Sequence, residues 1–361
     1  MRGALAGLLI VSLWALVAAC GGDAAPRSGS GAAPAVSPST GGATPTTGTS
    51  SAPPLARARV RVAHSTISGS VAPLWLAREF GLWERYGLDV ELTNISGTPV
   101  IMAALISGEV QFAQTSGDAA LSVQAREPEV VSLLNTVGAV SHRMMVVPSI
   151  QRPEELRGKR LGVFTIGDGN YAYLQKALPK VGVDPNDVVW TSVGGGNFAA
   201  LVQALAAGAI DGTLLTPPND LLARRAGAHE LFRLRDMGIP SAGLPIFTLR
   251  RLLREQPEVA EAFAAGVVDG VRMFKADSAT ARRVLREQLR LEDEEVLDWT
   301  HTTLLEPGMM LDRPFVDREQ TRAVVEMLVE EQPELRQLRV EQVTDTTILE
   351  SLDRKGLLPP P

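Results

Sequence analysis

The sequence predicts an α/β fold of two αβ lobes, each with a mainly parallel sheet, joined by a hinge and followed by extra C-terminal helices. The first observation behind this prediction is an internal repeat: two stretches about 100 residues apart carry similar short sequences in the same order. A strand-like run ends in Thr66-Ile67 in one and in Thr165-Ile166 in the other, and an Ala-Leu pair later precedes Gly108 or Gly208. The second observation is the alternation of strand-like and helix-like segments, which is typical of βαβ units and a parallel sheet.

The elements of the first lobe are expected between residues 59 and 113. Strands are expected where β-branched and apolar residues alternate, and helices where apolar residues recur at helical spacing before a glycine. Pro99 suits the first turn of a helix. Trp75 and Trp83 are expected to pack in the core. The predicted order is strand 59–64, helix 71–80, strand 88–93, helix 99–106 and strand 110–113.

The second lobe repeats this order, and long amphipathic helices follow it. We expect these long helices to pack on the first lobe, so that the chain crosses between the lobes twice. Before the repeat come two strand-like runs, 130–134 and 144–147, and a helical turn at 153–159. The repeat itself is predicted as strand 160–164, helix 171–178, strand 188–192, helix 198–207 and strand 212–215. The long helices are expected at 257–275, 278–289 and 317–331.

The N-terminus predicts export. Arg2 is followed by an uncharged run to Ala19 and then by Cys20, a pattern that fits a cleaved signal better than a membrane span. Residues 16–20 read Leu-Val-Ala-Ala-Cys, which resembles a bacterial lipobox, so Cys20 is the expected site of lipid attachment. The alternative is an ordinary signal with an incidental cysteine. The next segment, 21–57, is almost entirely Gly, Ala, Pro, Ser and Thr, which cannot offset its ordering entropy, so we expect a disordered tether.

These patterns give one expected domain organisation. It is a lipoprotein signal peptide at 1–20, a disordered tether at 21–57, the first part of lobe I at 58–147, lobe II at 148–242, and a return to lobe I with the C-terminal helices at 243–361.

Composition excludes several function classes. Cys20 is the only cysteine, so the folded body can form neither a disulfide nor a thiolate metal site. The net charge of −6 is mild, and the few aromatic residues and the lack of a basic stripe argue against a nucleic-acid partner. The four histidines have no metal-binding spacing, and no Gly-x-Ser-x-Gly motif is present. We therefore expect no enzyme, no catalytic residue, no metal and no cofactor.

The candidate binding residues follow from the predicted topology. Ligands of open parallel α/β sheets bind beyond the carboxyl ends of the strands, where loops lead into helices. Hydroxyls, glycines, an amide and one carboxylate occupy these positions, and such groups form hydrogen bonds without reactive chemistry. Any one of them is also a plausible helix cap. The expected ligand-binding residues are Ser65, Thr66, Ser68, Thr98, Thr115, Ser116, Thr165, Gly167, Asp168, Asn197 and Thr216.

Charge around these positions indicates the type of ligand. Helix N-termini favour anions, but Asp118 and Asp168 already lie near two of them. A neutral or zwitterionic organic solute is therefore favoured over a doubly charged oxyanion. Arg143 would reverse this judgement if it faced the ligand, and it is equally plausible as a salt-bridge partner. Tyr171 and Tyr173 are candidates for stacking on a ligand, with packing as the alternative.

The chain resembles the substrate-binding lipoproteins of bacterial ABC transporters, with the type II periplasmic-binding fold. The resemblance rests on four segments that follow the lipobox in the family's order: 80–92, 104–113, 155–163 and 204–211. It is strongest to the branch of sulfonate, taurine and nitrate binders and NMT1/THI5-like pyrimidine-precursor binders. Asp168 departs from the small polar residue expected where an anion is held, which argues against sulfonate or nitrate.

The resemblance implies a function. It implies a lipid-anchored, extracytoplasmic monomer that captures a small organic solute between its lobes and delivers it to an ABC permease. The anchor, acylated Cys20, would hold it at the outer face of the cytoplasmic membrane or in the periplasm. Two alternatives stay open: an NMT1/THI5-like enzyme of pyrimidine synthesis, and a ligand-sensing receptor for a membrane signalling partner.

Overall fold

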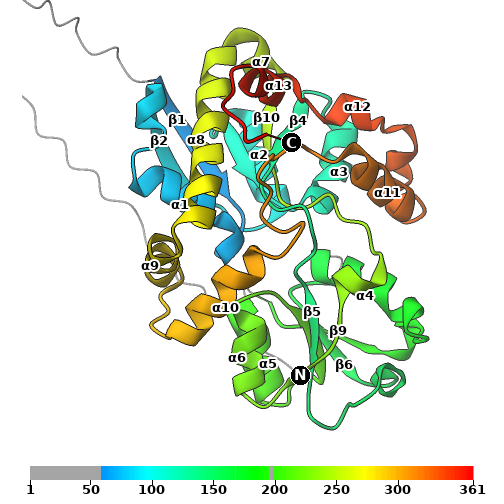
Figure 1. The fold of residues 1–361 in the computed structure, drawn as a ribbon. Helices are drawn as coiled ribbons and strands as arrows, with labels where there is room; N and C mark the ends of the chain where they lie inside the picture. Colours follow the sequence, from blue (N-terminus) through cyan, green and yellow to red (C-terminus); the bar gives the residue numbers. More distant parts are fainter. Residues whose placement is uncertain (1–57, 167, 195–197, 361) are drawn as a thin grey trace, which may run out of the picture. The chain divides into compact units, whose positions relative to one another are not determined.

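Two five-stranded sheets form the frame of the protein. The structure, a computed structural model, describes residues 58–166, 168–194 and 198–360. The expected signal peptide with Cys20, the expected tether, Gly167 and Asn197 lie outside these residues. Figure 1 shows β1, β2, β4 and β10 in the upper part of the described chain and β5, β6 and β9 in the lower part. The predicted fold class, two α/β lobes on mainly parallel sheets, is confirmed.

The two sheets have the same strand order and the same directions. In each, three neighbouring strands and an outer strand run parallel, and the fourth strand in the order runs antiparallel to both of its neighbours. The first sheet is β2 (Leu88–Asn94), β1 (Ala58–His64), β3 (Phe112–Gln114), β10 (Pro245–Leu249) and β4 (Val130–Asn135). The second is β7 (Val189–Ser192), β6 (Arg160–Val163), β8 (Gly212–Leu215), β5 (Arg143–Val146) and β9 (His229–Arg233).

The first crossing between the sheets comes earlier than expected. The expected boundary kept residues up to 147 in the first lobe, whereas β5 pairs with β8 and β9 in the second sheet. The reason is that the antiparallel strand of each sheet is the crossing strand itself: β5 arrives from the first sheet, and β10 returns to it. Periodicity within a strand does not tell which sheet the strand joins, so the sequence alone could not place this boundary.

Helices connect the strands within each sheet. Those of the first are α1 (Ala72–Glu79), α2 (Thr98–Ser107) and α3 (Gly117–Arg126); those of the second are α4 (Gly169–Lys180), α5 (Phe198–Ala206) and α6 (Asn219–Arg225). After β10 the described chain is helical, with α7 (Arg250–Glu255), α8 (Pro257–Ala276), α9 (Ser278–Leu289), α10 (Glu294–Leu304), α11 (Arg318–Leu328), α12 (Val340–Val343) and α13 (Thr347–Arg354). No helix of the described residues is both long and apolar enough to cross a membrane.

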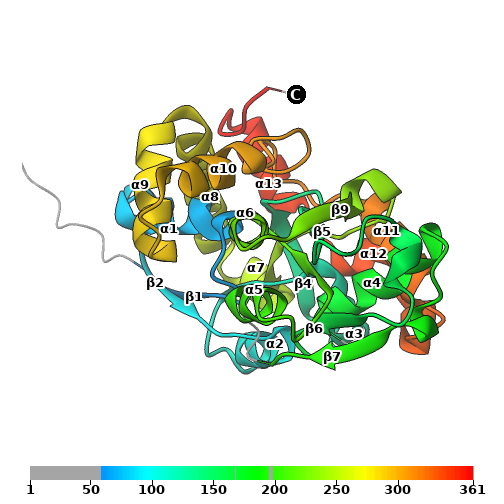
Figure 2. The same ribbon diagram turned by 90° about the horizontal axis from the view of Figure 1, so that it is seen from below.

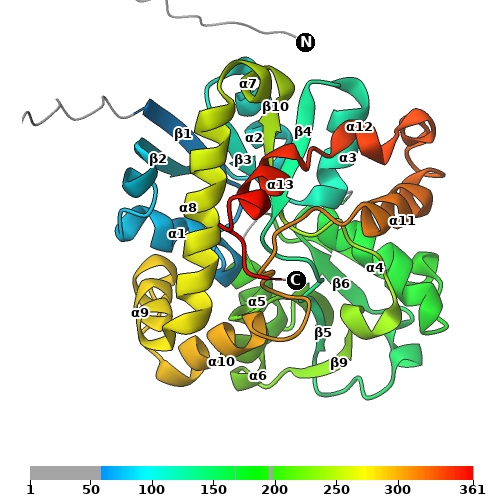
Figure 3. The same cartoon turned by 45° about the horizontal axis from the view of Figure 1, so that its top comes forward.

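Helix α8 closes the core of the first lobe against α1, as Figure 3 shows. The two helices approach closely because Gly270 has no side chain: a Cβ there would lie 2.2 Å from the backbone oxygen of Pro73. Beside them, the Trp83 ring stacks on Phe263 with the ring centroids 5.6 Å apart, and its Nε1 donates to the Phe263 carbonyl over 3.0 Å. Trp75 and Trp83 are both buried, which confirms their predicted place in the core.

The remaining C-terminal helices do not all pack on the first lobe alone. Helix α11 packs on α3, and Figure 2 shows it with α12 on the side of α4, away from α8, α9 and α10. Helix α10 reaches the second lobe, where Trp299 Nε1 donates to both carboxylate oxygens of Asp220 on α6. The C-terminal helices therefore link the two lobes as well as cover the first.

Candidate functional site

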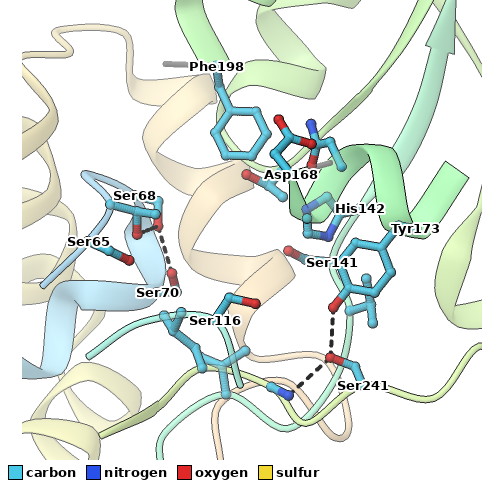
Figure 4. A pocket seen from close by; sticks show the side chains of 18 of the residues that line it. Ser65, Ser68, Ser70, Ser116, Ser141, His142, Asp168, Tyr173, Phe198 and Ser241 are labelled. Carbon is cyan, nitrogen blue, oxygen red and sulfur yellow. Dashed lines mark hydrogen bonds between the residues drawn. The ribbon is translucent and has the colours of Figure 1, made fainter. Parts of the chain in front are cut away.

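A cavity of about 270 Å³ lies between the two sheets, at the carboxyl ends of their parallel strands. Figure 4 shows residues from both lobes around it, with Ser65, Ser68 and Ser70 on one side and Asp168 and Tyr173 on the other. The expected residues that line it are Ser65, Thr66, Ser68, Thr98, Ser116, Asp168 and Thr216. Most of the described candidates, which were predicted from the carboxyl ends of the strands, thus line one cavity.

Two expected residues, Thr115 and Thr165, are not among the lining residues. Thr115 is fully buried beneath the cavity, and its hydroxyl is 2.8 Å from that of Thr98, which does line it. The Thr165 side chain is exposed, and its backbone N–H donates to Asp168 over 3.0 Å. In the internal repeat, Thr66 and Thr165 therefore follow equivalent strands, but only Thr66 lines the cavity.

Hydroxyl groups dominate the wall that the first lobe contributes. The Ser68 and Ser70 oxygens are 2.6 Å apart, and the Thr66 hydroxyl is 3.5 Å from that of Ser68. Ser116 caps α3, since its oxygen accepts from the Ala119 N–H over 3.4 Å. These groups can donate and accept hydrogen bonds but carry no charge.

Asp168 acts as a helix cap at the edge of the cavity. Its two carboxylate oxygens accept from the backbone N–H groups of Tyr171, over 2.7 Å, and Thr165, over 3.0 Å. This is the capping role that was the alternative for each candidate. The capped helix also presents a negative charge to the cavity, because Asp168 lines it.

The sequence prediction missed the residues that line the cavity from the two crossing segments. Ser141 and His142 immediately precede β5, and Ser241, Gly243 and Leu244 precede β10. An antiparallel strand begins at the edge where its parallel neighbours end, so the residues before it face the same cavity. Only carboxyl ends of strands were considered in the sequence, so the amino ends of these two strands were overlooked.

The second lobe contributes an aromatic wall. The Phe164 and Phe198 rings meet edge to face with their centroids 5.0 Å apart. The His142 ring lies 5.1 Å from Tyr173 and 6.2 Å from Phe198, centroid to centroid. All four residues line the cavity. Tyr171, the other stacking candidate, packs on Trp190 instead.

Tyr173 links this wall to the first lobe. Its hydroxyl is 2.5 Å from Oδ2 of Asp118 and 3.0 Å from the Ser241 oxygen. The other Asp118 oxygen accepts from the Ala242 N–H over 2.6 Å. Burial raises the pKa of Asp118 to about 6, and the two hydrogen bonds act in the opposite direction.

His142 is held neutral beside the cavity. Burial lowers its pKa to about 4, while hydrogen bonding with the Asn170 side chain acts in the opposite direction. Its Nδ1 atom is buried and has no hydrogen-bond partner among the described residues.

None of the described residues that line the cavity is a lysine or an arginine. Arg143, the candidate that would have favoured an anion, is buried away from it in an ion-pair cluster. Its Nε is 2.9 Å from Asp220 Oδ2, and its Nη1 donates to Glu230 over 3.1 Å. Among the described residues, no three His, Cys, Asp or Glu side chains gather in a way that could hold a metal ion. The cavity suits hydrogen bonding and aromatic packing.

Solved structures share this fold. A structure from Bordetella bronchiseptica RB50 superposes with a TM-score of 0.70 at 18% identity, covering 83% of this chain and 98% of that one. The alkanesulfonate-binding protein SsuA from Xanthomonas axonopodis pv. citri bound to MOPS gives 0.66 at 18% identity, covering 80% and 99%. The desulfurization enzyme DSZB gives 0.64 at 15% identity, covering 82% and 100%. The fold therefore occurs in binding proteins and in an enzyme.

Curated relatives match parts of the chain. A protein of Brucella abortus (strain 2308) is 31% identical over 126 residues, which are 33% of this chain and 39% of that protein. The taurine-binding periplasmic protein of Escherichia coli (strain K12) is 29% identical over 196 residues, which are 53% of this chain and 59% of that protein. The chain thus spans less than two thirds of the length of these relatives. The model of the family described as NMT1/THI5 like matches residues 68–281, more than half of the chain, and the protein therefore belongs to this family.

Proposed function

We propose that this protein is the substrate-binding component of an ABC import system, which captures a small organic solute in the cavity between its lobes and presents it to a membrane permease. The observation that carries the proposal is the cavity itself, lined by hydroxyls from one lobe and by aromatic rings from the other. Its polar groups suit reversible binding. The names of the taurine-binding and alkanesulfonate-binding proteins support the same function.

The proposal extends to location and motion. Export and attachment through an acylated Cys20 would keep the binding body at the membrane surface, near its permease. Two chain crossings, 136–142 and 234–244, connect the sheets, and opening and closing about them would admit and enclose the solute. An enzyme is the competing function, since DSZB shares the fold. No hydroxyl among the described lining residues is hydrogen-bonded to a histidine that could act as its base, and this favours binding over catalysis.

The test begins with the natively purified full chain in detergent. Mass spectrometry of the denatured protein would identify a retained solute, and the solute would then be added back to stripped protein. A ligand at 100 times its dissociation constant stabilises the native state by about 2.7 kcal/mol, so a clear rise in melting temperature is expected. Chemical conversion of the solute would favour the enzyme, and the absence of any bound or stabilising solute would contradict the proposal.

A further inference from the structure

His142 has an unused hydrogen-bond acceptor beside the cavity. The ring lines the cavity wall, between the aromatic rings of Tyr173 and Phe198. Figure 4 shows it beside Tyr173, across the cavity from the serines of the first lobe. Its Nδ1 is buried, and no described residue hydrogen-bonds to it. Buried polar atoms are nearly always hydrogen-bonded, so an unpaired one at a cavity calls for a partner that enters the cavity.

The proposal depends on which ring nitrogen of His142 carries the proton. The Asn170 amide nitrogen donates to the Leu214 carbonyl over 3.2 Å, and hydrogen bonding with the Asn170 side chain acts to raise the pKa of His142. A neutral imidazole carries one N–H group and one lone pair, so Nδ1 is an acceptor when Nε2 carries the proton. Burial favours this neutral form.

The surroundings limit what kind of molecule supplies the donor. The described lining residues include the Asp168 carboxylate and no lysine or arginine, so no cationic side chain compensates an anionic ligand. Aromatic rings favour a planar molecule that packs against them. A cavity of about 270 Å³ suits a small molecule.

We infer that His142 is the specificity-determining acceptor of this site, and that its Nδ1 receives a hydrogen bond from an N–H or O–H group of a small, planar, uncharged solute. This inference rests on the proposed function and narrows its substrate class. His142 thus selects solutes that carry a hydrogen-bond donor. The hydroxyls of the first lobe form hydrogen bonds with the solute's remaining polar groups.

The test compares two probes that share an aromatic amide core, and it measures each of them on two variants of His142. Benzamide has an N–H donor, and N,N-dimethylbenzamide has none. His142→Leu removes the acceptor, whereas His142→Asn keeps an oxygen near the position of Nδ1. Dissociation constants would be measured by calorimetry on the full chain, with benzenesulfonate as an anionic probe of similar size. Circular dichroism would check that both variants fold.

The inference predicts a pattern of affinities. His142→Leu should weaken benzamide binding about tenfold, in keeping with the loss of one buried hydrogen bond. His142→Asn should stay within about threefold of the natural protein. N,N-dimethylbenzamide should bind more weakly to the natural protein and be insensitive to His142→Leu. Nitrogen NMR of the histidines should show the Nε2-protonated ring, with the Nδ1 signal shifting when benzamide binds.

Other outcomes would overturn the inference. Equal losses for both amides in His142→Leu would mean that the ring only packs. Tighter binding of benzenesulfonate than of benzamide would contradict an uncharged solute, as would an anionic solute retained by the native protein. If benzamide fails to bind while the retained solute binds, the inference fails and the proposed function stands. If no solute binds at all, the proposed function fails as well.

Discussion

The hydroxyl of Tyr173 on α4 lies 2.5 Å from Oδ2 of Asp118 on α3, so a hydrogen bond joins one helix of each lobe beside the cavity. The same hydroxyl contacts Ser241 on the returning chain crossing, and Asp118 also accepts from the Ala242 N–H. One helix of each lobe and one crossing therefore meet at a shared set of polar groups.

Removing this hydroxyl should weaken the fold. Tyr173→Phe leaves the Asp118 carboxylate without one of its two partners, and a buried acceptor that loses its partner costs about 1 to 3 kcal/mol. Urea unfolding of the full chain, monitored by tryptophan fluorescence, would measure the change. Tyr171→Phe is the matched control. Tyr171 lies in the same helix as Tyr173, but its ring packs on Trp190 and should tolerate the loss of the hydroxyl. Equal effects of the two substitutions would show that the Tyr173 hydroxyl contributes little.

The raised pKa of Asp118 predicts a dependence of stability on pH. Its native pKa of about 6 exceeds the ordinary value of 3.8, so the native state binds this proton more tightly than the unfolded chain. Its contribution to stability is fully present below about pH 4 and is lost as the pH rises through about 6. The unfolding free energy of the natural protein, minus that of Asp118→Asn, should therefore fall across this interval. A difference that stays constant or rises would contradict the assignment.

His142 should act in the opposite direction over nearly the same interval. Its native pKa of about 4 lies below the ordinary 6.5, so its contribution is present above about pH 6.5 and is lost as the pH falls through about 4. Relative to His142→Asn, the natural protein should lose stability on acidification. A pH-independent difference would mean that the imidazole is not held neutral. The two trends oppose each other in the natural protein, so the variants are needed to separate them.

The buried ion pair between Arg143 and Asp220 gives a further test. Arg143→Met leaves the fully buried Asp220 carboxylate without its cation, which typically costs about 3 to 5 kcal/mol. Replacing both residues with apolar ones should recover part of that loss, because no unpaired charge remains. The control is Arg59→Met, which breaks an exposed pair with Glu91 and should change stability by less than about 0.5 kcal/mol. Similar losses in both variants would contradict this account.

The expected lipid anchor has its own test in cells. Cys20→Ser removes the only thiol that could be acylated, so the protein should move from the membrane fraction to the soluble fraction. Detergent-phase partitioning of the natural protein and the variant would measure this. Unchanged partitioning would mean that Cys20 is not the anchor.

The sequence predicted the local elements well where periodicity and capping act over short distances. The helix expected at 278–289 is α9 with the same bounds, and the strand expected at 212–215 is β8. It also placed Thr66 and Thr216 at the cavity, because the carboxyl ends of parallel strands meet at one edge. These successes rest on rules that relate near neighbours in the chain.

The rest depends on contacts between distant residues. The strands β9 and β10 were not expected, and β5 was assigned to the wrong sheet, since pairing partners are not encoded within a short strand. His142 and Ser241 belong to the site only because two antiparallel strands begin at its edge. The role of Arg143 could not be predicted, because its ion-pair partners Asp220 and Glu230 lie far from it in the sequence.

The most direct test of the central claim is the dissociation constant of the retained solute for two tryptophan variants. Thr216→Trp would fill the cavity from the end of β8, whereas Thr93→Trp places the same bulk on an exposed position of β2. Calorimetry should show a loss of at least about 100-fold in affinity for Thr216→Trp, equal to about 2.7 kcal/mol, and no change for Thr93→Trp. Unchanged affinity in a folded Thr216→Trp protein would contradict the claim that the cavity between the lobes binds the solute.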